Sequence, residues 1–162
     1  MADEMNGVWE TCSSASVKRA SRRLGQLYED VLKPTGLRGT QFTLLAQIGM
    51  AEAPSLRQLA AALVMDLSAL GHTLKPLTRD GLVSLVADAS DKRVKRVILT
   101  PDGRARLAEA QRHWAVAQRR FEQVLGPDEA KALRQVLAEV SSPDFAARFA
   151  AAGREGGEPP AK

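Results

Sequence analysis

The sequence predicts a mainly α-helical protein that carries one small β-hairpin. Aromatic residues make up only 4% of the chain, and Ala and Leu fill most apolar positions, which favours helices over sheets. Apolar residues recur three or four positions apart over most of the length. The exceptions are two short alternating segments, 82–86 and 94–99, which indicate two strands joined by a turn.

Four helices are expected before the hairpin. Each has an apolar face and is separated from the next by Pro, Gly or an N-capping residue. Ser55 and Asp66 are the expected N-caps of the third and fourth helices, and Gly81 suits a left-handed residue at the end of the fourth. Pro76 lies inside the fourth helix, but the apolar pattern passes through it, so we expect one helix with or without a bend. The expected bounds are about 8–32, 40–50, 55–63 and 67–80.

The longest helical pattern follows the hairpin. Thr100 is the expected N-cap and Pro101 the first helical residue, the order that helix starts favour. Two apolar series at seven-residue spacing indicate a helix packed along another helix. A Gly-Pro pair at 126–127 ends it, and a last helix follows with an interruption at Pro143. The two series are Leu107, Trp114 and Phe121, and Ala110, Ala117 and Val124.

The positive charge of the chain is concentrated around the hairpin. The chain has 23 Lys and Arg against 19 Asp and Glu, a formal net charge of +4. Residues 72–106 hold eight basic and four acidic side chains, so this stretch carries the whole excess. A helix followed by a basic hairpin suits DNA phosphates and grooves, whereas the alternative is a merely solvated charged hairpin. The basic residues are Lys75, Arg79, Lys92, Arg93, Lys95, Arg96, Arg104 and Arg106.

The composition argues against several classes of protein. No apolar stretch approaches the roughly 20 residues of a membrane span, and the N-terminus lacks the pattern of a signal peptide. A single cysteine favours the reducing cytoplasm. Two histidines, with no Cys–His pair, glycine-rich phosphate loop or serine elbow, argue against an enzyme. One Cys and two distant His are too few for a metal site, so neither metal nor cofactor is expected.

The helices at the two ends of the chain predict a homodimer. A central module of about 60 residues cannot cover them all. Two chains with interwound end helices, related by a two-fold axis, would bury the apolar faces and match a palindromic DNA site. The alternative is a monomer whose ends fold back on itself.

Three motifs together resemble the MarR family of bacterial winged-helix regulators. The most specific is D-x-R-x-x-x-x-x-L-T-x-x-G, which runs here from Asp91 to Gly103 with every spacing intact. The segments 36–45 and 74–83 are also similar to those of the family. The resemblance covers nearly the whole folded chain, and it supports keeping Pro76 within a helix.

The resemblance implies a winged helix-turn-helix core flanked by N-terminal and C-terminal dimerisation helices. A single domain is then expected over 8–152, with a DNA-binding module at about 38–100 and dimerisation helices at about 8–33 and 101–150. Residues 1–7 and the Gly/Pro-rich tail 153–162 are expected to be disordered.

The resemblance also implies that the fourth helix enters the major groove and that the hairpin, or wing, reaches the minor groove. Arg93 would be the minor-groove residue and Asp91 would orient it; the alternative is an ion pair that only stabilises the turn. Many members have Thr and Arg where this chain has Ala69, Gly71 and His72, so shape and wing contacts are expected to carry more of the specificity. The expected DNA-binding residues are Ser68, Ala69, His72, Thr73, Lys75, Asp91, Lys92, Arg93 and Lys95.

The family further implies a repressor that a signal releases from DNA. One expected signal is a small anionic aromatic or acyl effector, bound by Lys18, Ser21, Arg38 and Phe42 where the dimer arm meets the DNA module. The alternative signal is peroxide acting on Cys12, which is otherwise a packing cysteine. An alternative of a different class is a winged-helix module that binds protein, which salt dependence distinguishes from DNA binding.

Overall fold

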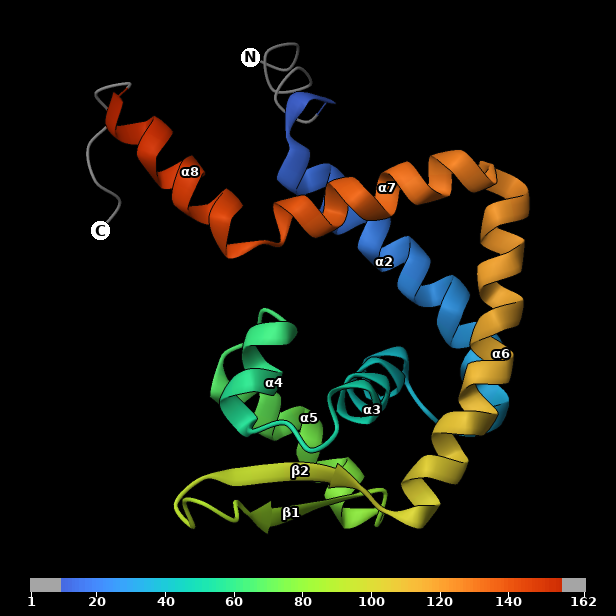
Figure 1. The fold of residues 1–162 in the computed structure, drawn as a ribbon. Coiled ribbons are helices and arrows are strands. Elements are labelled where there is room, and N and C mark those ends of the chain that lie inside the picture. Colours follow the sequence, from blue (N-terminus) through green and yellow to red (C-terminus); the bar gives the residue numbers. More distant parts are fainter. Residues whose placement is uncertain (1–9, 156–162) are drawn as a thin grey trace. The chain divides into compact units, whose positions relative to one another are not determined.

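The structure is a computed structural model that describes residues 10–155 (Figure 1). Helices and one hairpin make up the described part, as the sequence predicts. Their order is α2 (Ser13–Leu32), the 3-10 helix η1 (Lys33–Thr35), α3 (Gly39–Ala51), α4 (Leu56–Ala62), α5 (Leu67–Arg79), β1 (Val83–Ala87), β2 (Lys95–Leu99), α6 (Pro101–Leu125), α7 (Pro127–Val140) and α8 (Pro143–Glu155). None of the described helices is long and apolar enough to span a membrane.

The chain divides into two compact units, and the division falls within α6. The first unit ends at Ala117 and the second begins at Gln118. The hydrophobic core belongs to the first unit and is built mostly from leucines of α3, α4, α5 and the hairpin. In the second unit, Arg134 of α7 pairs with Glu122 of α6 at 3.2 Å. Of the two seven-residue series, Leu107, Ala110 and Ala117 are buried, whereas Val124 is 90% exposed.

The ends of the helices follow local capping rules, as predicted. The Ser55 hydroxyl accepts from the backbone N–H of Gln58 at 3.2 Å, and the Gln58 side chain accepts from the N–H of Ser55 at 2.9 Å, which completes a capping box. Asp66 accepts from the N–H of Ala69 at 2.7 Å. Gly81 has the positive φ of 70° that a helix end of this kind requires. Each of these contacts lies within a few residues, so the sequence alone could reveal it.

Pro76 lies inside α5, which remains one helix. Leu70, Leu74 and Leu77 on its inner face are buried in the core. This burial offsets the missing N–H of the proline, because the stability of a helix in a protein comes mainly from the packing of its apolar face.

Both ends of the described region differ from the expected bounds. The predicted helix from Val8 to Leu32 is interrupted at Cys12, which is extended with ψ of 100° and caps α2. The Sγ of Cys12 accepts from the N–H of Ala15 at 3.4 Å, which explains why α2 begins only after it. The expected disorder of residues 1–7 lies outside the described residues. The disordered tail expected from 153 does not include 153–155, which belong to α8, and residues 156–162 lie outside the described residues.

The hairpin is antiparallel, with Val83 opposite Leu99 and Ala87 opposite Lys95. The strands are within about one residue of the predicted bounds. β2 also faces α3 and α4 (Figure 1). There the N–H of Val97 donates to the carbonyl of Pro54 at 2.9 Å, and Ser55 forms an isolated bridge with the strand. The sequence did not predict this contact between the wing and the start of α4.

Candidate nucleic-acid interface

The outer face of α5 presents polar side chains to solvent. Ser68, His72 and Lys75 are exposed, opposite the leucines that anchor the helix in the core. Ala69 and Thr73 are only half-buried, and the Thr73 hydroxyl donates to the carbonyl of Ala69 at 3.1 Å. All five predicted residues of this helix are therefore at or near its surface. A helix with such a face suits the major groove, where hydroxyl and imidazole groups can bond base edges.

The tip of the wing holds an oriented arginine. Asp91 Oδ1 accepts from the backbone N–H and Nε of Arg93 at 3.0 and 3.1 Å, and Oδ2 accepts from Nη2 at 3.2 Å. These bonds lower the pKa of Asp91, the side-chain contribution being the larger. The Arg93 side chain is nevertheless 92% exposed. The pair therefore stabilises the turn and also directs a guanidinium outward.

Two lysines flank this arginine. Lys92 and Lys95 are exposed, and neither has an acidic partner among the residues that the structure describes. Their ammonium groups are available to phosphates, which attract such cations without regard to sequence. The wing thus combines an oriented guanidinium with free positive charge.

Asp88 is a buried acid in the wing, and the sequence predicted no function for it. It is 8% exposed, and its Oδ1 accepts from the N–H groups of Ser90 and Asp91 at 2.8 and 3.0 Å and from the Ser90 hydroxyl. Its Oδ2 pairs with Arg96. The Ser90 hydroxyl, then Arg96 and the backbone donors, hold the pKa of Asp88 well below its usual range. The sequence did not predict the pairing of Asp88 with Arg96, because the two residues are eight positions apart and meet only through the register of the strands.

Known proteins identify the family of the chain. The model of the MarR family matches residues 35–94. The transcriptional regulator MosR of M. tuberculosis, solved in complex with DNA, is 35% identical over 85% of this chain and 98% of MosR, with a TM-score of 0.74. The chain belongs to the MarR family. The family resemblance of its wing motif and its predicted winged-helix fold are thereby confirmed.

Other solved structures share the fold of this MarR-family chain. CouR from Rhodococcus jostii RHA1, a transcriptional repressor bound to a 23-mer DNA duplex, is 26% identical over 84% of this chain and 96% of CouR, with a TM-score of 0.76. An E. coli MarR mutant in complex with operator DNA is 24% identical over 82% of this chain and 96% of its own, with a TM-score of 0.74. A search of curated proteins found no match.

The predicted effector residues of the MarR-family chain lie on two helices. Lys18 and Ser21 are on α2, whereas Arg38 is the N-cap of α3 and Phe42 lies within α3. Lys18, Ser21 and Arg38 are exposed. Phe42 is instead buried, and its ring stacks on Trp114 with centroids 6.4 Å apart. Phe42 is therefore already engaged in packing within the first unit.

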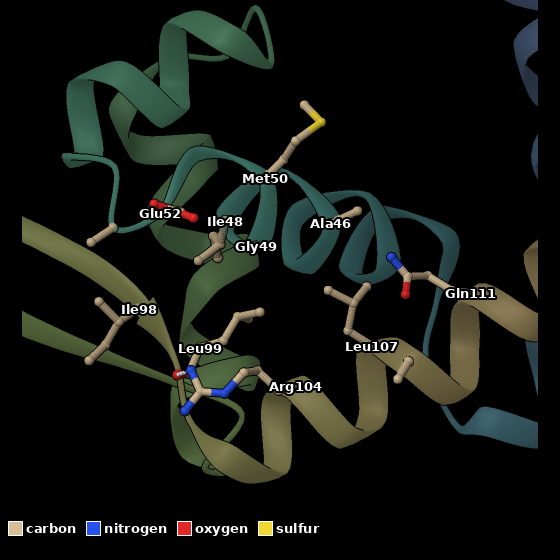
Figure 2. A pocket seen from close by; sticks show the side chains of 12 residues that line it. Ala46, Ile48, Gly49, Met50, Glu52, Ile98, Leu99, Arg104, Leu107 and Gln111 are labelled. Carbon is tan, nitrogen blue, oxygen red and sulfur yellow. Dashed lines mark hydrogen bonds between the residues drawn. The ribbon is translucent and has the colours of Figure 1, made fainter.

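A hollow of about 670 Å³ lies between α3, β2 and α6, and none of these four effector residues lines it. Ile48, Leu99 and Leu107 form apolar walls, and Arg104 and Gln111 lie beside them (Figure 2). The Arg104 guanidinium donates to the carbonyl of Leu99 at 2.9 Å. This size and this mixture of apolar and polar groups are in the range of small-molecule sites.

Cys12 is half-buried and free. Among the described residues, no group of three or more His, Cys, Asp or Glu is placed to hold a metal ion.

The low pKa of Asp88 predicts how stability depends on pH. Because the folded pKa lies below the ordinary value of 3.8, the stabilisation is fully present above that value and is lost as the pH falls below it. We expect Asp88→Asn to be less stable than the wild type at pH 7, with a difference that shrinks below about pH 4. Urea unfolding between pH 3 and pH 7 measures this. A difference that stays constant down to pH 3 would contradict it.

Proposed function

We propose that this chain is a transcriptional repressor that binds a palindromic operator as a homodimer, with α5 in the major groove and the wing in the minor groove. The observation that carries the proposal is the exposed, acid-oriented Arg93 at the tip of a basic wing beside the polar face of α5. A narrow minor groove is strongly negative and attracts such a guanidinium. The structures of MosR and CouR with DNA support the same function for this chain.

Exposed apolar side chains support the dimer. Val17 and Leu27 on α2 are about half exposed, and in the second unit Val136 and Val140 on α7 are similarly exposed. Exposed apolar groups on the surface of a helix are typical of surfaces that another chain covers. A second copy of this chain, related by a two-fold axis, would bury them and would also match the symmetry of a palindrome.

Release by a small effector is the second part of the proposal. Lys18 and Arg38 are exposed cations with no ion-pair partner among the described residues, and an anionic effector would need such groups. The hollow beside Arg104 is the other candidate place, with its apolar walls. Aromatic acids and acyl thioesters can be screened for release of operator DNA. Loss of the response in Arg38→Ala or in Arg104→Ala then separates the two places.

One observation favours peroxide sensing as a second candidate function. Cys12 is partly exposed at the N-terminus of α2, and its sulfur accepts from a backbone N–H. Reactive cysteines often occupy such positions. Peroxide is then expected to lower operator affinity in the wild type but not in Cys12→Ser. Unchanged affinity of the oxidised wild type would end this candidate.

The function is tested by selecting bound sequences from random DNA and measuring their affinity at several salt concentrations. If six to ten phosphates are contacted, affinity is expected to fall roughly 10³- to 10⁵-fold between 50 and 200 mM salt. Analytical ultracentrifugation is expected to give a dimer. A monomer, or an interaction with another protein that changes little with salt, would favour the protein-binding alternative.

A further inference from the structure

We propose that Arg96 and Asp88 are positioning residues that fix the wing to the helix-turn-helix, and so set where Arg93 meets DNA. We call Asp88, Arg96 and the carbonyl of Ala53 the wing clamp. The inference rests on the proposed DNA-binding function and assigns a further part of its machinery. Arg96 binds groups of the protein itself, whereas Lys92 and Lys95 are free to contact DNA.

The guanidinium of Arg96 contacts two parts of the molecule. Arg96 Nε donates to Asp88 Oδ2 in the wing, and its Nη1 donates to the carbonyl of Ala53 at 2.9 Å. The Arg96 side chain is 37% exposed. Arg96 therefore joins the wing to the turn between α3 and α4. A planar fork with several fixed donors can hold both partners at once, which an ammonium group cannot do as well.

The turn between α3 and α4 has an unusual backbone conformation. Glu52 and Ala53 have positive φ angles of 46° and 69°. Residues with a Cβ occupy this region only when their surroundings compensate. The compensation here comes from β2, because Arg96 binds the Ala53 carbonyl and the N–H of Val97 donates to the carbonyl of Pro54 at 2.9 Å. The wing strand and the turn before α4 hold each other in place.

Hydrogen bonds also connect the wing clamp to the tip of the wing. Asp88 Oδ1 accepts from the N–H of Asp91 at 3.0 Å, and Asp91 in turn holds the guanidinium of Arg93. The N–H of Val94 donates to the carbonyl of Asp91 at 2.9 Å and closes the turn. Hydrogen bonds therefore run without a break from the Ala53 carbonyl through Arg96, Asp88 and Asp91 to Arg93.

The clamp makes the wing rigid before DNA arrives. Without it, the wing would have to be ordered during binding, and that entropy would be subtracted from the affinity. Arg96→Met keeps the apolar stem but removes both bonds of the guanidinium. We expect this variant to lose about tenfold or more in operator affinity, mainly through faster dissociation.

A double-mutant cycle tests whether this loss passes through Arg93. Operator affinity is measured for the wild type, Arg96→Met, Arg93→Ala and the double variant. We expect Arg96→Met to lower operator affinity about tenfold when Arg93 is present, but under about threefold in the Arg93→Ala background. The effects of coupled residues are not additive. Lys95→Met is the matched control, since it removes a neighbouring charge and should cost the same in both backgrounds. An equal cost of Arg96→Met in both backgrounds would overturn the proposal.

Hydrogen exchange of the free protein supplies a readout that needs no DNA. In Arg96→Lys, which keeps the charge and the fold but not the fork, we expect the amides of Val94 and Val97 to exchange about tenfold faster. The amide of Leu74 in α5 should not change. Unchanged exchange of the wing amides would contradict the role of the wing clamp. Failure of the wild type to bind any DNA would instead contradict the proposed function.

Discussion

Replacing Arg93 by Ala is expected to weaken binding to every DNA sequence, operator and random alike, by about 5- to 150-fold for each wing that contacts DNA. The side chain is 92% exposed, so its removal costs little in folding. Its guanidinium would recognise the negative potential of the minor groove more than any base. Fluorescence anisotropy with operator and scrambled duplexes measures the effect. Arg112→Ala, which removes an exposed charge from α6, is the control.

His72→Ala is expected to behave differently from Arg93→Ala. His72 is exposed on α5, where an imidazole can donate to a guanine edge or to phosphate. Its loss should change the preference among operator variants while leaving affinity for random DNA nearly unchanged. Equal losses on operator and random DNA would show that His72 does not read bases, and a sequence-selective loss in Arg93→Ala would place that residue at base edges.

Gly103→Ala is expected to destabilise the protein by roughly 1–3 kcal/mol or more, although Ala normally stabilises a helix relative to Gly. A Cβ at Gly103 would lie 1.9 Å from the carbonyl oxygen of Leu82. That oxygen cannot easily withdraw, because it also accepts from the N–H and the hydroxyl of Thr100 at 3.1 and 3.2 Å. The start of α6 and the start of the hairpin therefore approach closely only with Gly at this position.

Gly71→Ala is the matched comparison for Gly103→Ala. A Cβ at Gly71 meets nothing within 4 Å, so the helix propensity of Ala should raise the free energy of unfolding by about 1 kcal/mol. Urea unfolding of the two variants and the wild type measures both changes. If Gly103→Ala were as stable as Gly71→Ala, this would contradict the claim that the Leu82 carbonyl leaves no room for a Cβ at position 103.

In the motif that runs from Asp91 to Gly103, the sequence predicts the role of some residues and not of others. Its spacing resembles that of the MarR family, and this resemblance implied that Asp91 orients Arg93, which the structure shows as a side-chain pair. The motif gave no physical reason for Gly103. The structure supplies one, because the carbonyl of Leu82 lies where a Cβ would be. The break at Cys12 was missed because a thiol is a weak and uncommon cap, so the apolar pattern carried the prediction through it.

The sequence by itself determined where most helices begin and end, the presence of the hairpin and the concentration of positive charge. The helix ends follow from contacts within a few residues, such as the capping of α4 by Ser55. The hairpin follows from the alternation of apolar residues, and the charge from the composition alone. Only the tertiary structure decided which charges are free. Arg96 and Arg93 look alike in the sequence, but Arg96 is bound to Asp88 and to a carbonyl 43 residues away, whereas Arg93 points outward. The reason is physical: strand register and the packing of distant turns arise from the whole core, and no local pattern of residues specifies them.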